Sequence, residues 1–300
     1  MKKNNILFFI STILLLSNIA FILPSSGIWA MYPKTKNIVP NALINYQAPY
    51  EPKTIAVTYP ILQAKNYILL DVDTNKIIFS KNQNDIVYPA STTKLATALT
   101  ALNIYPLDEI ITIPEIYTEG KTMELAAGEK ITVRSLVTAL LVYSANDSAI
   151  NLAKHHSEGY NGFIDQMNLL VNKYNLKNTH FTNVDGIHNA NHYSTVFDLS
   201  QLARIAIKNK IVTETVKQKN VIVTDVDHLY SHNLVSTNEL LGKIPEIEGL
   251  KTGWTPEAGG CFIGLINING HYLISVIAQS DDRFKDTEII VNWAKKNIIW

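Results

Sequence analysis

Three short groups of polar residues have types and spacings that suit acyl transfer: Ser91-Thr92-Thr93-Lys94, Ser144-Ala145-Asn146 and Lys251-Thr252-Gly253. The first pairs a hydroxyl nucleophile with an amine that can serve as its base. The second offers a hydroxyl and an amide, and the third a cation and a hydroxyl. Each group alone is a weak signal, because so short a pattern often arises by chance. All three in this order indicate a serine acyl-enzyme.

Ser91 and Lys94 are predicted to share one face of a helix, because they lie three residues apart and are followed by apolar residues at helical spacing: Leu95, Ala98, Leu99 and Leu102. A serine in the first helical turn lies at the positive end of the helix dipole, which favours negative charge on Oγ. Lys94 can accept the serine proton only when neutral, so burial or a second cation must destabilise its ammonium. Lys251 is the candidate for that cation. Taken alone, this group fits a helix N-cap and a solvated lysine better.

Ser144 and Asn146 follow the apolar run Leu140–Tyr143 and lie between two predicted helices. The Ser144 hydroxyl could relay a proton to a departing amine. The Asn146 amide could hold a substrate backbone and orient Lys94. An ordinary helix-joining turn with Asp147 as the cap uses the same residue types.

The third group lies in a predicted strand that runs from Glu248 to Trp254. Lys251 and the Thr252 hydroxyl suit a terminal carboxylate, the first by charge and the second by hydrogen bonding. Gly253 lets an extended peptide approach the strand closely. The alternative is a turn or an edge strand with an incidental lysine.

The elements that must position these groups change type along the chain. Period-2 and turn signals predict a hairpin first, and 3.6-residue periodicity then predicts a block of helices. The hairpin is expected over 66–71 and 76–80. Helices are expected from Ser91, after Thr195, and over 132–141, 147–155 and 162–174. Strands are expected near 220–226, 248–251, 260–268 and 271–280, followed by a last helix over 285–300. This order predicts an α+β sheet domain with an inserted helical lobe at about residues 91–205.

Segments beyond the three groups resemble one family closely, the low-molecular-mass penicillin-binding proteins or D-alanyl-D-alanine carboxypeptidases. The resemblance covers about Leu62 to Trp300 and rests on Tyr88–Lys94, Met123–Glu129, Asn183–Ile187, Tyr193–Thr195 with Asp198, and Gly249–Thr255 with Ala258-Gly259. The same motif set also occurs in class A β-lactamases. The resemblance implies the penicillin-binding/β-lactamase-like fold, an antiparallel sheet flanked by helices.

The resemblance also implies an activity and a role for each motif residue. Ser91 would attack the carbonyl between two terminal D-alanines of a peptidoglycan stem peptide, and Lys94 would take its proton. The backbone N–H groups of Ser91 and Trp254 would form the oxyanion hole. The proton for the leaving D-alanine would pass through Ser144, while Asn146, Lys251, Thr252, Gly253 and Trp254 would bind substrate. β-Lactams would acylate the same serine, and no cofactor or metal is implied.

The N-terminus has the pattern of an export signal, with Lys2 and Lys3 before the apolar run Ile6–Leu23. This run is nearly long enough to span a bilayer, so residues 1–30 are expected to be a signal peptide or an N-terminal membrane anchor. Residues 31–58 are rich in Pro and Asn and predict an extended linker, and residues 59–300 form the expected peptidase domain. The protein is therefore expected in the cell envelope.

Composition adds few constraints. Basic and acidic residues number 26 each, so no charge excess indicates a nucleic-acid partner. The lone Cys261 can form no internal disulfide. Many members of the family continue into a β-rich C-terminal domain with an amphipathic anchor, whereas this sequence ends at Trp300. Membrane contact is accordingly expected only through the N-terminal segment.

Other functions share part of this pattern. Endopeptidases of the same family cleave peptidoglycan cross-links, so the balance between carboxypeptidase and endopeptidase stays open. A β-lactamase would need a glutamate followed by Leu-Asn between the second and third motifs, and the sequence has none there. A β-lactam sensor would need a signalling membrane segment, and the intact motifs argue against a decayed wall-binding protein. Zinc is not expected, because His155-His156 and His188/His192 have no third ligand at suitable spacing.

Overall fold

The computed structural model describes residues 50–56 and 58–300. The predicted signal or anchor (1–30) and most of the predicted linker lie outside these residues. The end of the linker segment lies within them: strand β1 (Lys53–Thr54) pairs antiparallel with β11 (Ile298–Ile299). Among the described residues, no helix is both long and apolar enough to cross a membrane.

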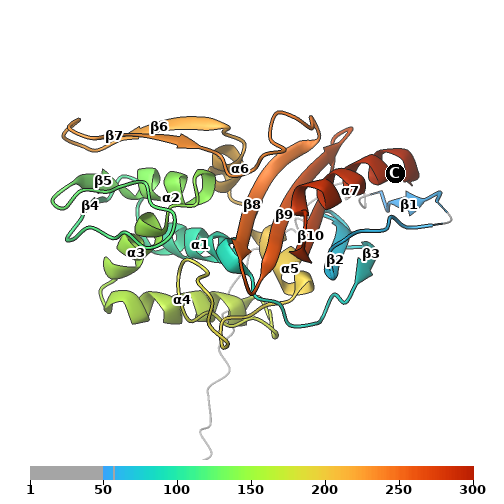
Figure 1. Ribbon diagram of the computed structural model, residues 1–300, viewed down its shortest axis with the longest axis horizontal. Helices are drawn as coiled ribbons and strands as arrows, with labels where there is room; N and C mark the ends of the chain where they lie inside the picture. The colour runs from blue at the N-terminus through green and yellow to red at the C-terminus, as the bar shows by residue number, and fades with distance from the viewer. Residues whose placement is uncertain (1–49, 57) are drawn as a thin grey trace, which may run out of the picture. The chain divides into compact units, whose positions relative to one another are not determined.

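The main sheet of the described chain has five antiparallel strands in the order β3-β2-β10-β9-β8 (Figure 1). Its strands are β2 (Asn66–Asp71), β3 (Ile77–Lys81), β8 (Ile247–Thr255), β9 (Gly259–Ile268) and β10 (His271–Ser280). The predicted hairpin is confirmed, since β2 and β3 pair across a turn at residues 72–76. Strand β8 lies at the edge of the sheet, which leaves one side of its backbone unpaired within that sheet.

Both faces of the sheet are buried, which explains the continuous apolar run in β2. Successive side chains of a strand point to opposite faces. Ile68 and Leu70 therefore join the core shared with the helical lobe, whereas Leu69 joins a second core under the C-terminal helix α7 (Arg283–Asn297). Helix α7 packs on β9 and β10 through Ile290 and Ala294. Helix α5 (Val196–Ala206) packs on β10 and β2 from the other face.

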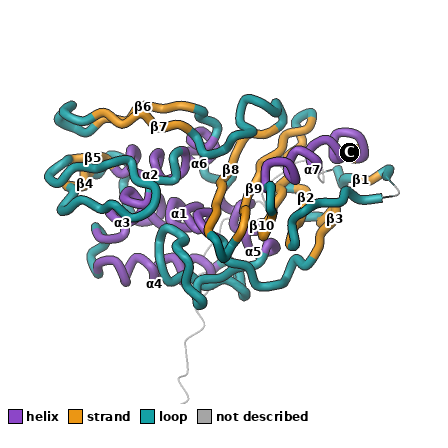
Figure 2. The backbone as a smooth tube through the Cα atoms, in the orientation of Figure 1, coloured by secondary structure: helices purple, strands orange, loops and turns teal. Residues whose placement is uncertain are grey.

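The helical lobe forms much as predicted, and Figure 2 shows its helices gathered beside the five strands. Thr132 and Thr195 cap their helices, each accepting a hydrogen bond from a backbone N–H three residues on. The helices are α1 (Lys94–Ile104), α2 (Val133–Val142), α3 (Asn146–Lys154), α4 (Gly159–Lys173), α5 and α6 (Lys210–Val216). Ser91 lies in a 3₁₀ turn, η1 (Ala90–Thr93), that leads directly into α1.

Some elements differ from the sequence prediction. The last helix ends at Asn297 rather than at Trp300, because residues 298–299 extend to pair with β1. Helix α6 and the short pair β4 (Ile110–Thr112) and β5 (Lys130–Thr132) are not predicted. Strand β6 (Asn220–Thr224) is predicted, whereas its partner β7 (Ser231–Val235) is not.

Candidate active site

Ser91 and Lys94 lie side by side because the 3₁₀ turn continues into α1. Lys94 Nζ donates a hydrogen bond of 2.9 Å to Ser91 Oγ. The preceding Ala90 has φ 47°, a left-handed conformation that is unfavourable for a residue with a Cβ. Such local strain concentrates at functional sites, and here it adjoins the candidate nucleophile.

Lys94 is fully buried, with no exposed surface. Besides Ser91, its ammonium donates to Asn146 Oδ1 at 2.7 Å and to the backbone oxygen of Asp185 at 2.8 Å. Burial lowers the pKa of Lys94 to about 8, although the carboxylates of Asp185 and Asp147 act in the opposite direction. The charged form of Lys94 still predominates at neutral pH, but a far larger fraction is neutral than for an ordinary lysine, as a lysine base requires.

Ser144 lies in the loop between α2 and α3, as predicted, with φ 68°. It accepts a hydrogen bond of 2.9 Å from Lys251 Nζ, and the side chains of both residues are buried. Burial lowers the pKa of Lys251 well below its ordinary value, and the charge of Lys94 lowers it further. The charge of Lys94 thus acts on Lys251, whereas burial, rather than the charge of Lys251 expected from the sequence, lowers the pKa of Lys94.

Strand β8 presents the third motif against the candidate nucleophile, Ser91. A Cβ built on Gly253 would lie 2.8 Å from the backbone nitrogen of Ser91, so only glycine allows this approach. Thr252 Oγ1 donates to Thr237 Oγ1 at 2.7 Å. Trp254 is 60% exposed. Because β8 is an edge strand, an extended peptide can lie along it.

A pocket of about 320 Å³ opens over these residues. Six of the eight predicted site residues line it: Ser91, Ser144, Asn146, Thr252, Gly253 and Trp254. The other two, Lys94 and Lys251, are buried and do not line the pocket. Lys94 is hydrogen-bonded to Ser91, and Lys251 is hydrogen-bonded to Ser144. All eight residues therefore come together, although they are spread over more than 160 positions.

The pocket also contains residues that the motifs do not reveal. Arg283, at the start of α7, lines the wall, and its buried Nε has no hydrogen-bond partner among the described residues. A guanidinium in such a position suits a carboxylate. Thr237, Asp185 and Lys121 contribute as well. The only sequence signal for any of them is that Asp185 falls within the family-like segment Asn183–Ile187.

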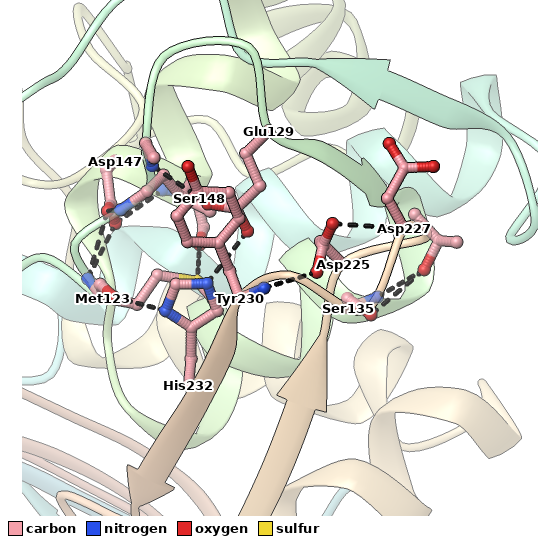
Figure 3. A network of polar contacts seen from close by, with 12 residues as sticks. Met123, Glu129, Ser135, Asp147, Ser148, Asp225, Asp227, Tyr230 and His232 are labelled. Carbon is pink, nitrogen blue, oxygen red and sulfur yellow. Dashed lines mark hydrogen bonds and ion pairs between the residues drawn. The ribbon is translucent and has the colours of Figure 1, made fainter.

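The loop that bears Lys121 is held in place by buried charged groups (Figure 3). The Asp147 carboxylate accepts from the backbone nitrogens of Met123 and Leu125 at 3.1 and 3.2 Å. His232, on β7, donates from Nδ1 to the Met123 carbonyl oxygen at 2.8 Å and pairs through Nε2 with Glu129 at 2.9 Å. The hairpin β6–β7 is thereby tied to the rim of the pocket.

The histidines that raised the question of zinc have other contacts. His192 accepts from the backbone nitrogen of Thr182 at Nδ1, so its proton lies on Nε2 and is donated to Thr93 Oγ1 at 2.8 Å. Burial lowers the pKa of His192 to about 3. His155 pairs instead with Glu109. In the described part of the chain, His, Cys, Asp and Glu form no group of three that could hold a metal ion.

Comparisons with known proteins identify the family and the fold. The sequence profile of the D-alanyl-D-alanine carboxypeptidases of peptidase family S11 matches residues 53–282. The chain is 30% identical over 207 residues to the D-alanyl-D-alanine carboxypeptidase DacF of Bacillus subtilis, covering 66% of this chain and 53% of that one. It is also 30% identical over 215 residues to a D-alanyl-D-alanine endopeptidase of Pseudomonas aeruginosa, covering 69% and 68%.

The crystal structure of a DD-transpeptidase from Streptomyces superimposes with a TM-score of 0.75 and 30% identity, covering 79% of this chain and 98% of that one. The chain therefore belongs to the D-alanyl-D-alanine carboxypeptidase family, the low-molecular-mass penicillin-binding proteins, and has their α+β fold. It spans 53% of the Bacillus subtilis relative and 64% of a carboxypeptidase of Escherichia coli.

Proposed function

We propose that this protein is a serine-type D-alanyl-D-alanine carboxypeptidase that removes the terminal D-alanine from peptidoglycan stem peptides. The observation that carries the proposal is the bonded group Ser91–Lys94–Asn146, which faces a pocket beside the edge strand β8. A buried lysine can serve as the base for the serine nucleophile, and the edge strand can pair with an extended peptide. Together these features fit acyl transfer from the end of a peptide.

The first step forms the acyl-enzyme. Neutral Lys94 accepts the proton of Ser91 as Oγ attacks the carbonyl carbon between the two D-alanines. The negative oxygen that develops is held by the backbone N–H groups of Ser91 and Trp254, each donor contributing on the order of 3 kcal/mol in comparable sites. The close approach of Gly253 to Ser91 supports this pairing of N–H groups.

In the second step the C–N bond breaks and D-alanine leaves. The proton that Lys94 took from Ser91 passes to the departing amine through Ser144, which is bonded to Lys251. The carboxylate of the leaving residue suits Thr252 and Arg283 at the pocket wall. Water then attacks the ester on Ser91 and releases the shortened peptide, and β-lactams enter the same path because they resemble the D-alanyl-D-alanine end.

Cleavage of cross-links is the second candidate, because one relative bears the name of an endopeptidase. Both reactions acylate the same serine and differ only in the amine that leaves. Proteins of this family act on peptidoglycan in the cell envelope. We further propose that residues 1–30 direct export to that compartment.

The test is the release of D-alanine from a diacetyl-L-Lys-D-Ala-D-Ala peptide by the full chain, followed by mass analysis of digested peptidoglycan. A carboxypeptidase converts pentapeptide stems into tetrapeptides and leaves the cross-linked dimers intact. Loss of the dimers with little free D-alanine would replace this proposal by the endopeptidase. Absence of both products from a folded protein would refute peptidase activity altogether.

A further inference from the structure

Lys121 and Arg283 both line the pocket but come from different parts of the fold. Arg283 and Thr252 belong to α7 and β8 on the sheet side, whereas Lys121 belongs to the loop beside Asn146 on the helical side. The carbonyl oxygen of Lys121 accepts a hydrogen bond of 2.7 Å from the backbone nitrogen of Asn146. The cation is thus anchored directly beside a substrate-binding residue.

The neighbour of Lys121 fixes its backbone still further. A Cβ on Gly120 would lie 2.4 Å from Asn146 Nδ2, so the loop approaches the asparagine closely at this point. Asp147 and His232 hold the next turn of the loop through Met123 (Figure 3). A cation on such a braced backbone is well placed to select a ligand, because little ordering is left for binding to impose.

The side chain of Lys121 is directed by an aromatic ring. Its Nζ lies 3.9 Å from the centroid of Tyr143, a favourable cation–π geometry. Among the described residues, no carboxylate lies within ion-pair distance of this ammonium, and no hydrogen bond uses it. The side chain is exposed to the pocket. A cation held in this way without an anionic partner remains available for an anionic group of a ligand.

The charges of the pocket wall indicate two anionic groups rather than one. Its lining includes the cations Lys121 and Arg283, while the single acidic residue there, Asp185, is buried and accepts from the backbone of Ile187. The terminal carboxylate of the proposed substrate matches Arg283 and Thr252. The acyl part of that peptide must leave Ser91 on the other side, toward Asn146 and Lys121.

We infer that Lys121 is a specificity-determining residue that binds a side-chain carboxylate on the amino acid preceding D-Ala-D-Ala. This inference rests on the proposed function. It assigns the protein to stem peptides whose third residue is a diamino diacid with a free carboxylate. Peptides with that carboxylate amidated, or with lysine at this position, become poorer substrates.

The test compares two acylated tripeptides that differ in one group: diaminopimelate-D-Ala-D-Ala with its side-chain carboxylate free, and the same peptide with that carboxylate amidated. The full chain is expected to prefer the free acid by about fivefold in kcat/KM, the size of one exposed ion pair. Lys121→Gln should bring this ratio close to one, Lys121→Arg should preserve most of it, and Lys121→Glu should invert it. The ratio is taken within each variant, so changes in the common acylation step cancel.

The matched control is Lys177→Ala, which removes an exposed lysine that does not line the pocket and should leave the ratio unchanged. Equal hydrolysis of both peptides by the wild-type chain, or a preference that survives in Lys121→Gln, would overturn the role of Lys121 and leave the carboxypeptidase standing. No D-alanine from either peptide would overturn both.

Discussion

Lys94 donates to three oxygens, those of Ser91, Asn146 and Asp185. An ammonium has three N–H donors, so this arrangement satisfies the protonated form completely. Loss of one proton leaves a lone pair on Nζ, and the hydrogen bond to Ser91 then reverses, with the hydroxyl donating. Loss of one proton from Lys94 therefore converts this arrangement into the form that would activate Ser91.

This arrangement predicts the pH dependence of acylation. Because burial lowers the pKa of Lys94 to about 8, the charged, inactive form dominates below that pH. The second-order rate constant for acylation by a penicillin should rise about tenfold per pH unit below pH 8 and level off above it. Rapid-quench labelling between pH 6 and 10 measures this curve.

A variant identifies the group responsible. Asn146→Asp places a carboxylate against Lys94 Nζ, which favours the ammonium and raises its pKa. The rising part of the curve of acylation rate against pH should move to higher pH in this variant. A rising part that keeps its position would belong to another group, and a flat profile in the wild type would exclude Lys94 as the base.

Among individual residues, the sequence identifies those that are brought into contact by their spacing along one element. Ser91 and Lys94 are neighbours on a helix, so their contact follows from local geometry. Arg283 and Thr237 are common residue types outside any motif, and only the packing of α7 and the segment after β7 brings them to the pocket. Nothing in their local sequence could have predicted this.

At the scale of elements, the tie between β7 and the pocket loop carries the clearest expectation. His232→Ala leaves the buried Glu129 carboxylate and the Met123 carbonyl without their partner, which should lower the free energy of unfolding by about 2–3 kcal/mol. It should also raise KM for the peptide more than it lowers kcat, because the loop with Lys121 loses its support. Urea unfolding and steady-state kinetics measure the two effects.

The control for this variant is Asp227→Ala on the same hairpin, which removes an exposed pair with Lys130. It should change stability by less than about 1 kcal/mol. If His232→Ala, like Asp227→Ala, changes neither KM nor the free energy of unfolding, the hairpin does not support the pocket.

Elements with a strong periodic pattern are predictable, whereas a weakly patterned helix such as α6 is not, even though Asn209 caps it by accepting from the Ile211 N–H. Helices α2 and α5 begin at threonine caps that the sequence displays. Helix α6 has seven residues, several of them β-branched, and forms through packing against α2 and β8 rather than through propensity. Strand β7 reads Ser-His-Asn-Leu-Val, and it forms through pairing with β6 and burial of Leu234 in the core.

At the scale of the whole described domain, one carboxylate joins its beginning to its end. Asp286, fully buried on α7, accepts from the backbone nitrogens of Gln63 and Ala64 at 2.8 Å each and from Ser280 Oγ at 2.6 Å. The sequence places Asp286 in a predicted helix and indicates nothing of its bonds to Gln63 and Ala64, because these two residues lie more than 200 positions away along the chain.

Asp286→Ala should destabilise the domain by about 3 kcal/mol or more, because three donors lose their acceptor in a buried site. Its penicillin-labelling rate at low temperature should stay close to that of the wild type, since Asp286 does not line the pocket. The exposed neighbour Asp281 gives the control, and Asp281→Ala should shift the urea midpoint very little. Equal stability of the two variants would disprove this role for Asp286.

The assignment of Ser91 as the nucleophile is tested by the site of covalent labelling with a fluorescent penicillin. The full chain should form a single adduct, and peptide mapping by mass should locate it on Ser91. Ser91→Ala should unfold at the same urea concentration as the wild type and form no adduct. An adduct on another residue, labelling that survives in Ser91→Ala, or a folded wild-type protein that is never labelled would contradict the role of Ser91 as the acylated nucleophile.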